Sequence, residues 1–249
     1  MAREWGISVG PRFPRARYSF AGPAGDGAVL KIAPVEDDEA DLEADGLAVW
    51  GGDGAVRLLR HDRARRALLI ERCIPGDDAS TVDDDVAIAV ALEVGRRLWK
   101  PFTGGPFHTA ATEVARWLDA ASTTSHPYVA IARERFGVIG PKHDVLVHGD
   151  YHHHNLLRHG DRWLAIDPKP LLAEPEFDVV TLLWNPIDAF PTRARTERRI
   201  AAFAAAGLDE RRVRDWAVIR GTYLALPLGA DEDEATAPQL AVVRMLLER

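Results

Sequence analysis

The chain contains a single cysteine in 249 residues, no long hydrophobic run and no excess of basic charge. One cysteine, Cys73, excludes both an intramolecular disulfide and a cysteine-based zinc site, which fits a reducing cytoplasm. No apolar stretch approaches the roughly 18 residues that a membrane span needs. The first ten residues, MAREWGISVG, also lack the apolar segment of a signal peptide. We therefore expect a cytoplasmic protein that has no membrane partner.

The charge balance argues against a nucleic-acid partner. The sequence has 38 acidic and 31 basic residues, for a net charge of -7, so a basic face that binds phosphates is disfavoured. A cationic small molecule is compatible with this charge. The composition, 47% hydrophobic with seven tryptophans, is that of a folded protein rather than a disordered one.

The pattern of apolar residues divides the chain into two parts. Residues 1–75 contain the strand-like stretches AVLKIAP (28–34) and RALLIERCIPG (66–76), separated by one helical run over 37–50. The turn-forming IPGDDAS (74–80) follows, and Ser80 or Thr81 is expected to begin a helix. Residues 76–249 are mostly helical, apart from two short strands over 144–150 and 163–169. We predict an α+β chain with a small strand-rich lobe, 1–75, and a larger helical lobe, 76–249.

The segment HGDYHHHN (148–155) holds four of the nine histidines. A zinc site is disfavoured, because consecutive histidines do not converge on one ion and no helix supplies closing ligands in the manner of HExxH. The oxygen-bearing residues suggest other chemistry. Phosphoryl transfer needs a carboxylate at the acceptor hydroxyl and oxygen ligands for magnesium. Asp150, Asn155 and, at the end of the next strand, Asp167 have the residue types and the spacing that kinases use.

These motifs carry a resemblance to a known family. VHGDYHHHNLL together with WLAIDPKPLLAEPEFDVVTLLWNP resembles the aminoglycoside phosphotransferase-like kinases, and more narrowly the streptomycin 6-phosphotransferase, or aminoglycoside/hydroxyurea antibiotic resistance kinase, group. The resemblance implies a bilobal protein-kinase-like fold, with ATP and Mg²⁺ as cofactors. It also implies that Asp150 is the catalytic base or orients the hydroxyl, while Asn155 and Asp167 hold magnesium.

The resemblance also suggests roles for residues around this loop. His148 and His152 would support the loop backbone, and Asp178 would hydrogen-bond the loop from the start of a helix. His153 and His154 are assigned to solvent. In the small lobe, Lys31 would contact the α- and β-phosphates and pair with a helical glutamate; Glu43 is preferred over the alternative, Glu39.

The nucleotide side contains one departure from the family pattern. LLIERCIPG would form the hinge beside adenine, with Glu71 and Cys73 at the nucleotide and Cys73 as an apolar pocket liner. No glycine occurs from Pro11 to Phe20, where relatives have a turn of small residues over the phosphates. Ser19 is expected to contact phosphate there, and Arg15 and Arg17 either do the same or face solvent.

The acceptor is expected to be a small, cationic molecule, with streptomycin as the best single candidate. A kinase of another hydroxylated metabolite and a nucleotide-binding pseudokinase remain as alternatives, whereas a protein kinase is disfavoured because no segment after Asp167 is long enough for an activation loop. The choice of ATP over GTP and the oligomeric state stay open. Four acids that might line an acceptor site are instead expected to be surface charges: Glu174, Glu176, Asp188 and Asp215.

Overall fold

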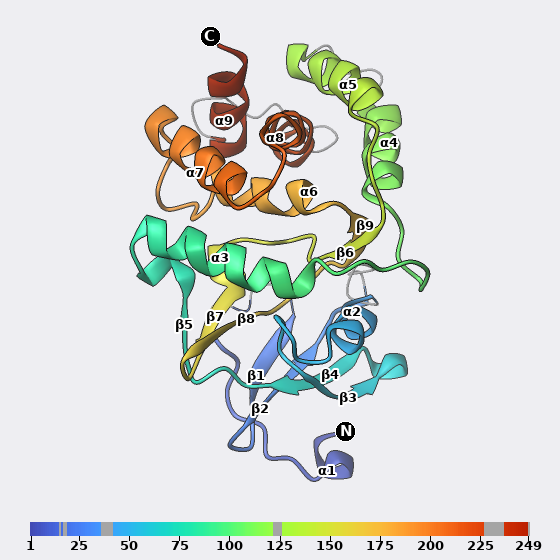
Figure 1. Ribbon diagram of the computed structural model, residues 1–249. Coiled ribbons are helices and arrows are strands. Elements are labelled where there is room, and N and C mark those ends of the chain that lie inside the picture. The colour runs from blue at the N-terminus through green and yellow to red at the C-terminus, as the bar shows by residue number, and fades with distance from the viewer. Residues whose placement is uncertain (15, 17–18, 36–41, 122–125, 227–236, 249) are drawn as a thin grey trace.

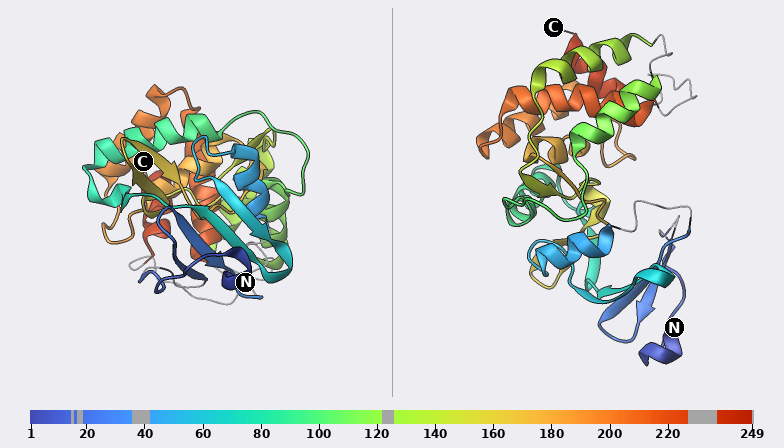
Figure 2. Two further views of the ribbon diagram at one scale, coloured as in Figure 1. Left: turned by 90° about the horizontal axis from the view of Figure 1, so that it is seen from below. Right: turned by 90° about the vertical axis from the view of Figure 1, so that its right-hand side faces the viewer.

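The computed structural model describes residues 1–14, 16, 19–35, 42–121, 126–226 and 237–248. It has two lobes, a strand-rich one formed by the N-terminal part and a helical one formed by the rest (Figure 1). Seen from the side, the molecule is elongated, with α1 (Ala2–Trp5) at one end and the C-terminal helices at the other (Figure 2). None of the helices in the described ranges has the length and hydrophobicity that a membrane span requires.

The small lobe is built on an antiparallel four-stranded sheet in the order β1-β2-β4-β3. Lys31 lies opposite Ala21 of β1 and Leu68 of β4, so it is in one of the two central strands of the sheet. Helix α2 contributes Leu47 and Trp50 to the core. The elements are β1 (Phe20–Ala24), β2 (Ala28–Ile32), α2 (Glu43–Trp50), β3 (Leu58–Asp62) and β4 (Ala67–Glu71).

Two small sheets lie between this lobe and the C-terminal helices (Figure 1). One has the order β5-β7-β8 and the other pairs β6 with β9. The loop from His148 to Asn155 connects β6 to β7, so both sheets support it. The strands are β5 (Pro75–Asp78), β6 (Val145–Val147), β7 (Leu156–His159), β8 (Arg162–Ala165) and β9 (Leu171–Ala173).

The helical lobe is organised around α8, which contributes the fully buried Trp216 and Ile219 to the core. Helix α3 lies between the small lobe and the C-terminal helices (Figure 1). The helices are α3 (Asp84–Leu98), α4 (Ala110–Ala120), α5 (Pro127–Ile139), α6 (Pro175–Val179), α7 (Arg193–Ala205), α8 (Glu210–Ala225) and α9 (Pro238–Leu247).

One apolar core runs through both lobes, from Leu47 and Ile70 in the small lobe to Leu146 and Leu164 near the loop and Phe203 in the helical lobe. Burial of this continuous apolar surface stabilises the packing of the two lobes against each other. The boundary near residue 75 stays a prediction. At that point β5 leaves the small lobe and pairs with β7, with Pro75 opposite His159.

The predicted elements mostly occur, with three differences. Five short strands were not predicted, because each has only three to five residues and FAGPA, LLRHD and PGDD do not alternate apolar and polar side chains; they are β1, β3, β5, β7 and β9. The helix expected to begin at Ser80 or Thr81 begins at Asp84 instead. Ser80 and Thr81 belong to a 3-10 turn because both hydrogen-bond Asp78. Of the helix expected over 37–50, residues 37–41 lie outside the described part.

Candidate active site

The loop after β6 is held by a carboxylate from α6. Asp178 is fully buried and accepts hydrogen bonds from the backbone N–H groups of His148 and Gly149, each at 2.9 Å. Trp99, at the end of α3, donates its indole N–H to the same carboxylate at 2.9 Å. Charge-assisted hydrogen bonds of this kind are about twice as strong as neutral ones, so Asp178 fixes the backbone ahead of Asp150.

Gly149 allows this loop to pass very close to the segment after β8. Its φ angle is 81°, in the left-handed region that favours glycine. A Cβ atom at this position would lie 1.9 Å from the carbonyl oxygen of Lys169. The neighbouring backbone is bonded too, because Lys169 N–H donates to His148 O at 2.8 Å. The glycine of the motif is therefore required by space as well as by conformation.

Asp150 lies beside Asn155 and His152. The amide nitrogen of Asn155 donates to Asp150 O at 2.9 Å and to Asp150 Oδ2 at 3.3 Å, and His152 Nε2 lies 3.5 Å from Asp150 Oδ1. Burial raises the pKa of Asp150, but the hydrogen bond from His152 and the charges of His152, His148 and Lys169 outweigh it and hold the pKa well below its usual range. Asp150 is thus a carboxylate at neutral pH, able to accept a hydroxyl hydrogen bond.

Asn155 and Asp167 are brought together by the β7–β8 hairpin. Leu156 pairs with Ala165, and the N–H of Ile166 donates to Asn155 O at 2.9 Å, so Ile166 lies across from Asn155 and Asp167 is the next residue. The backbone of Asp167 adopts φ 58°, which is uncommon for a residue with a side chain and turns the chain sharply before Pro168. The Asp167 side chain is 56% exposed.

Lys31 connects the small lobe to this hairpin. Its ammonium group lies 2.5 Å from Glu43 Oε2 and also contacts Asp167 Oδ1. Burial lowers the pKa of Lys31, but the two carboxylates outweigh it and raise the pKa above its ordinary value. The expected pairing of Lys31 with Glu43 is present in the structure, and the alternative partner, Glu39, lies outside the described residues.

The expected hinge residues lie at the end of β4. Glu71 accepts from Arg57 N–H at 3.2 Å and contacts Arg162 of β8 at 3.3 Å, so it links the two lobes. Cys73 is 8% exposed, and burial raises the pKa of its thiol to about 12. Ser19 directly precedes β1 and is half-buried, whereas Arg15 and Arg17 lie outside the described residues.

The four histidines of the motif contact different groups. His148 is fully buried, with Nε2 bonded to Ile166 O at 2.9 Å and Nδ1 accepting from Asp150 N–H at 3.2 Å. His152 Nδ1 accepts from the N–H of His154 at 3.3 Å. His148 and His152 thus contact the loop backbone, as the resemblance implied for them.

The assignment of His153 to solvent was wrong, and His154 is only partly exposed, at 25%. His153 is 1% exposed, because the 3-10 turn His153–Asn155 directs its ring into the protein, and burial lowers its pKa to about 3. His154 contacts Asp78 Oδ2 at 3.2 Å. A run of three histidines gives no sequence signal of which ring points inward.

Three of the four acids expected on the surface are also partnered or buried. Glu174 is 1% exposed and accepts from Trp216 Nε1 at 2.9 Å and from Arg212 Nη2 at 2.6 Å. Glu176 is 9% exposed and accepts from Asp209 N–H at 3.0 Å. Asp215 forms an ion pair with Arg135 at 2.6 Å, and only Asp188 is exposed as expected. These carboxylates brace the helical lobe.

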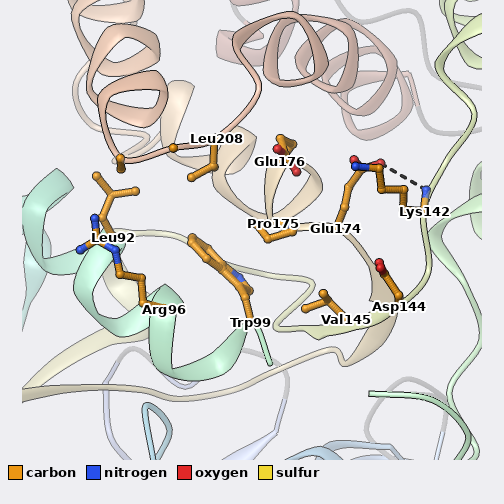
Figure 3. Close-up of a pocket in the computed structure, with 12 residues that line it drawn as sticks. Leu92, Arg96, Trp99, Lys142, Asp144, Val145, Glu174, Pro175, Glu176 and Leu208 are labelled. Carbon is orange, nitrogen blue, oxygen red and sulfur yellow. Dashed lines mark hydrogen bonds between the residues drawn. The ribbon is translucent and has the colours of Figure 1, made fainter. Parts of the chain in front are cut away.

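A cavity of about 380 Å³ lies between α3, α6 and the loop that joins α7 to α8 (Figure 3). Leu92, Arg96 and Trp99 border it on one side and Glu174, Pro175 and Glu176 on the other. None of the residues named as candidates for nucleotide or metal binding lines it. It touches the loop only indirectly, because Trp99 on its wall bonds Asp178.

Sequence reasoning missed two residues that contact the loop machinery. Trp99 donates to Asp178, and Arg220 of α8 donates to Phe177 O at 2.9 Å and to Gly149 O. Each comes directly after an apolar residue in a run that the sequence predicts as helical, so nothing in the local sequence distinguishes it from other helix residues. The one available signal is that Arg220 stands in the otherwise uncharged stretch WAVIRGTYLAL (216–226).

Taken together, the site presents two acidic side chains, an amide and a buried lysine where the lobes meet. Asp150 can accept a hydroxyl hydrogen bond, the oxygens of Asn155 and Asp167 can hold a hard cation, and Lys31 can neutralise phosphate. Such a set suits the transfer of a phosphoryl group to a hydroxyl.

Several known proteins are similar to this chain in sequence. The family model described as aminoglycoside/hydroxyurea antibiotic resistance kinase matches residues 18–228. A streptomycin 6-kinase of Streptomyces griseus is 33% identical over 246 residues, covering 89% of this chain and 78% of its own length. A streptomycin 3''-kinase of Klebsiella pneumoniae is 32% identical over 209 residues, covering 77% of this chain and 76% of its own length.

A solved structure shares the fold. A thermostable mutant of an aminoglycoside phosphotransferase, in a ternary complex with AMP-PNP and hygromycin B, aligns with a TM-score of 0.66 over 99% of this chain and 97% of its own. The sequence identity is 18%, so the similarity concerns the fold. The predicted α+β, bilobal kinase-like architecture is confirmed.

Proposed function

Because this chain belongs to the aminoglycoside/hydroxyurea antibiotic resistance kinase family, we propose that it transfers the γ-phosphoryl group of ATP to a hydroxyl group of streptomycin. It is a phosphotransferase with an alcohol group as acceptor, and its family acts on antibiotics of the aminoglycoside type. The observation that carries the proposal is the convergence of Lys31, from the small lobe, with Asp167, Asn155 and Asp150 of the second lobe.

In the proposed reaction the acceptor hydroxyl oxygen forms a bond to the γ-phosphorus while the bond from that phosphorus to the β,γ-bridging oxygen breaks and ADP leaves. Asp150 accepts the hydroxyl hydrogen bond and orients the oxygen, and the proton passes to the Asp150 carboxylate. Lys31 neutralises charge on the nucleotide phosphates. Positioning and electrostatic stabilisation supply most of the rate in reactions of this class.

The donor set near Asp167 fits magnesium. Asn155 turns its amide nitrogen to Asp150, and Asp167, which follows the residue bonded to Asn155 O, has a half-exposed carboxylate. Hard oxygen ligands of this kind, completed by water and phosphate oxygens, are what Mg²⁺ prefers. Asn155 and Asp167 would hold the ion, which would neutralise charge between the phosphates.

Streptomycin is proposed as the acceptor for two reasons. Two relatives at 32–33% identity are streptomycin kinases, which act at different positions, 6 and 3''. Its guanidinium groups also suit a chain with a net charge of -7. Hydroxyurea is the second candidate, because the family description names it and a relative at 32% identity is a hydroxyurea phosphotransferase.

The test is ATP turnover with magnesium in the presence of streptomycin, hydroxyurea or a panel of hydroxylated metabolites, with mass detection of a phosphorylated product. Asp150→Asn should abolish the product, and Asp161→Asn, in the exposed β7–β8 turn, serves as the matched control that should keep it. Phosphorylated streptomycin, absent only with Asp150→Asn, would support the proposal. ATP binding without any phosphorylated acceptor would contradict it and indicate a nucleotide-binding role without transfer.

A further inference from the structure

Two consecutive peptide groups lead into Asp150, and each is held on both sides. In the first, between His148 and Gly149, the carbonyl accepts from Lys169 N–H and the N–H donates to Asp178. In the second, between Gly149 and Asp150, the N–H donates to His148 Nδ1 at 3.2 Å and the carbonyl accepts from Arg220 Nη2. Arg220 is the contact in this set that comes from α8.

Arg220 is buried and fixed in one orientation by its neighbours. It is 4% exposed, and it donates from Nη1 to Phe177 O at 2.9 Å. Its guanidinium carbon lies 4.2 Å from the centre of the Phe177 ring. Among the described residues its Nε has no hydrogen-bond partner. A guanidinium can donate through two nitrogens in fixed directions, which an ammonium group cannot do.

The charge of Arg220 is costly at this place. Burial lowers its pKa, and the carboxylates of Asp178, Glu113 and Asp150 act on it only through space. A buried cation is usually retained with a direct ionic partner, and apolar residues of similar volume often give equal or greater stability. Stability therefore does not account for an arginine here, whereas the bond to the peptide ahead of Asp150 does.

We propose that Arg220 is a positioning residue for the transfer reaction. By holding the Gly149–Asp150 peptide from the α8 side, it sets the direction in which the Asp150 carboxylate leaves the loop. A displacement of about 1 Å at a reacting group can lower the rate by about a hundredfold. The role in transfer rests on the proposed function, whereas the role in holding the loop does not.

The test compares Arg220→Met with Arg212→Met. Arg212 is on the same helix and donates to Glu174, Ile139 O and Gly140 O, none of which belongs to the loop. Arg220→Met should lower kcat per folded molecule by about 10- to 100-fold with little change in the KM for ATP. Arg212→Met should leave both unchanged. Arg220→Lys keeps the charge and one donor, so it should recover part of the lost kcat, and it replaces Arg220→Met if that variant does not fold.

Hydrogen exchange of a peptide that spans 148–155 gives a readout independent of catalysis. Faster exchange in Arg220→Met or Arg220→Lys, but not in Arg212→Met, is expected. If exchange and kcat in the Arg220 variants match those of Arg212→Met, the positioning role is wrong. If the wild-type enzyme transfers no phosphate but the exchange difference is present, the proposed function fails and the contact from Arg220 to the loop stands.

Discussion

Two of the buried cations among the described residues, Lys31 and Arg220, are held in opposite ways. Lys31 contacts two carboxylates, one of which, on Asp167, is 56% exposed. Arg220 contacts two backbone carbonyl groups deep in the helical lobe. Because the Asp167 carboxylate is exposed, Lys31 can replace this partner with a phosphate group at small cost. Arg220 cannot leave its backbone carbonyl partners unless the packing around them is disrupted. Under the proposed function, Lys31 is on the nucleotide side of the site, which we call the exchangeable side. Arg220 holds the loop that orients the acceptor, and we call this the rigid side.

The largest expected effect lies on the exchangeable side. Lys31→Met should lower kcat by about 100- to 1000-fold, since loss of one preorganised donor to developing charge has an effect of that size. Steady-state phosphorylation of the acceptor measures it. Lys100→Met is the matched control, because Lys100 pairs with Asp53 at the exposed surface and should have no effect. An equal loss in both variants would contradict a specific role for Lys31.

Gly149→Ala tests the rigid side. The new Cβ would meet Lys169 O at 1.9 Å and the φ of 81° is unfavourable for alanine, so a loss of about 3 kcal/mol in the free energy of unfolding is expected, together with loss of transfer. Urea denaturation measures it. Gly140→Ala shares the positive φ, at 57°, but has no atom within 4 Å of its Cβ, so it should lose only about 1 kcal/mol. Equal losses would show that space around Gly149 is not limiting.

The same division explains what the sequence could and could not predict. The helices α3, α4, α5, α7, α8 and α9 follow from long helical runs in the sequence. Asp150, Asn155 and Asp167 were predicted from residue type and spacing, whereas Asp178 was implied by the family resemblance. Arg220 was missed because its partners are carbonyl groups, which every residue has and which leave no sequence pattern. The direction of His153 was missed because three adjacent histidines differ only in backbone geometry.

A smaller effect is expected from Trp99→Phe, which removes the indole N–H that braces Asp178 from behind the loop. The hydrogen bond to a buried carboxylate should contribute about 1.5 kcal/mol to stability, and kcat should fall severalfold because His148 and Gly149 keep their bonds to Asp178. Thermal unfolding and kcat together measure it. Trp216→Phe removes an equivalent bond, to Glu174, so it should lose similar stability with kcat unchanged. Equal kcat in the two variants would show that the Trp99 hydrogen bond does not help to position the loop.

The smallest effect is expected at Cys73, which is in the proposed hinge beside the nucleotide and for which no chemical role is proposed. Cys73→Ala should leave transfer unchanged within experimental error. In the native protein, burial shifts the pKa of the thiol from 9.0 to about 12, which lowers the thiolate fraction at pH 8 by roughly a thousandfold. Alkylation at pH 8 should therefore be slow in the native protein and fast in urea.

The same shift fixes the sign of a pH effect on stability. Between pH 9 and 12 the folded thiol keeps its proton and the unfolded thiol loses it, so the folded state binds more protons and stability falls as the pH rises. Below pH 9 the group contributes no pH dependence, so Cys73→Ala should flatten the alkaline limb of an unfolding curve and leave the neutral region unchanged. Rapid alkylation of the folded protein at pH 8 would show that the segment around Cys73 opens to solvent. The exchangeable contacts would then extend from the Lys31 ion pairs to the proposed hinge.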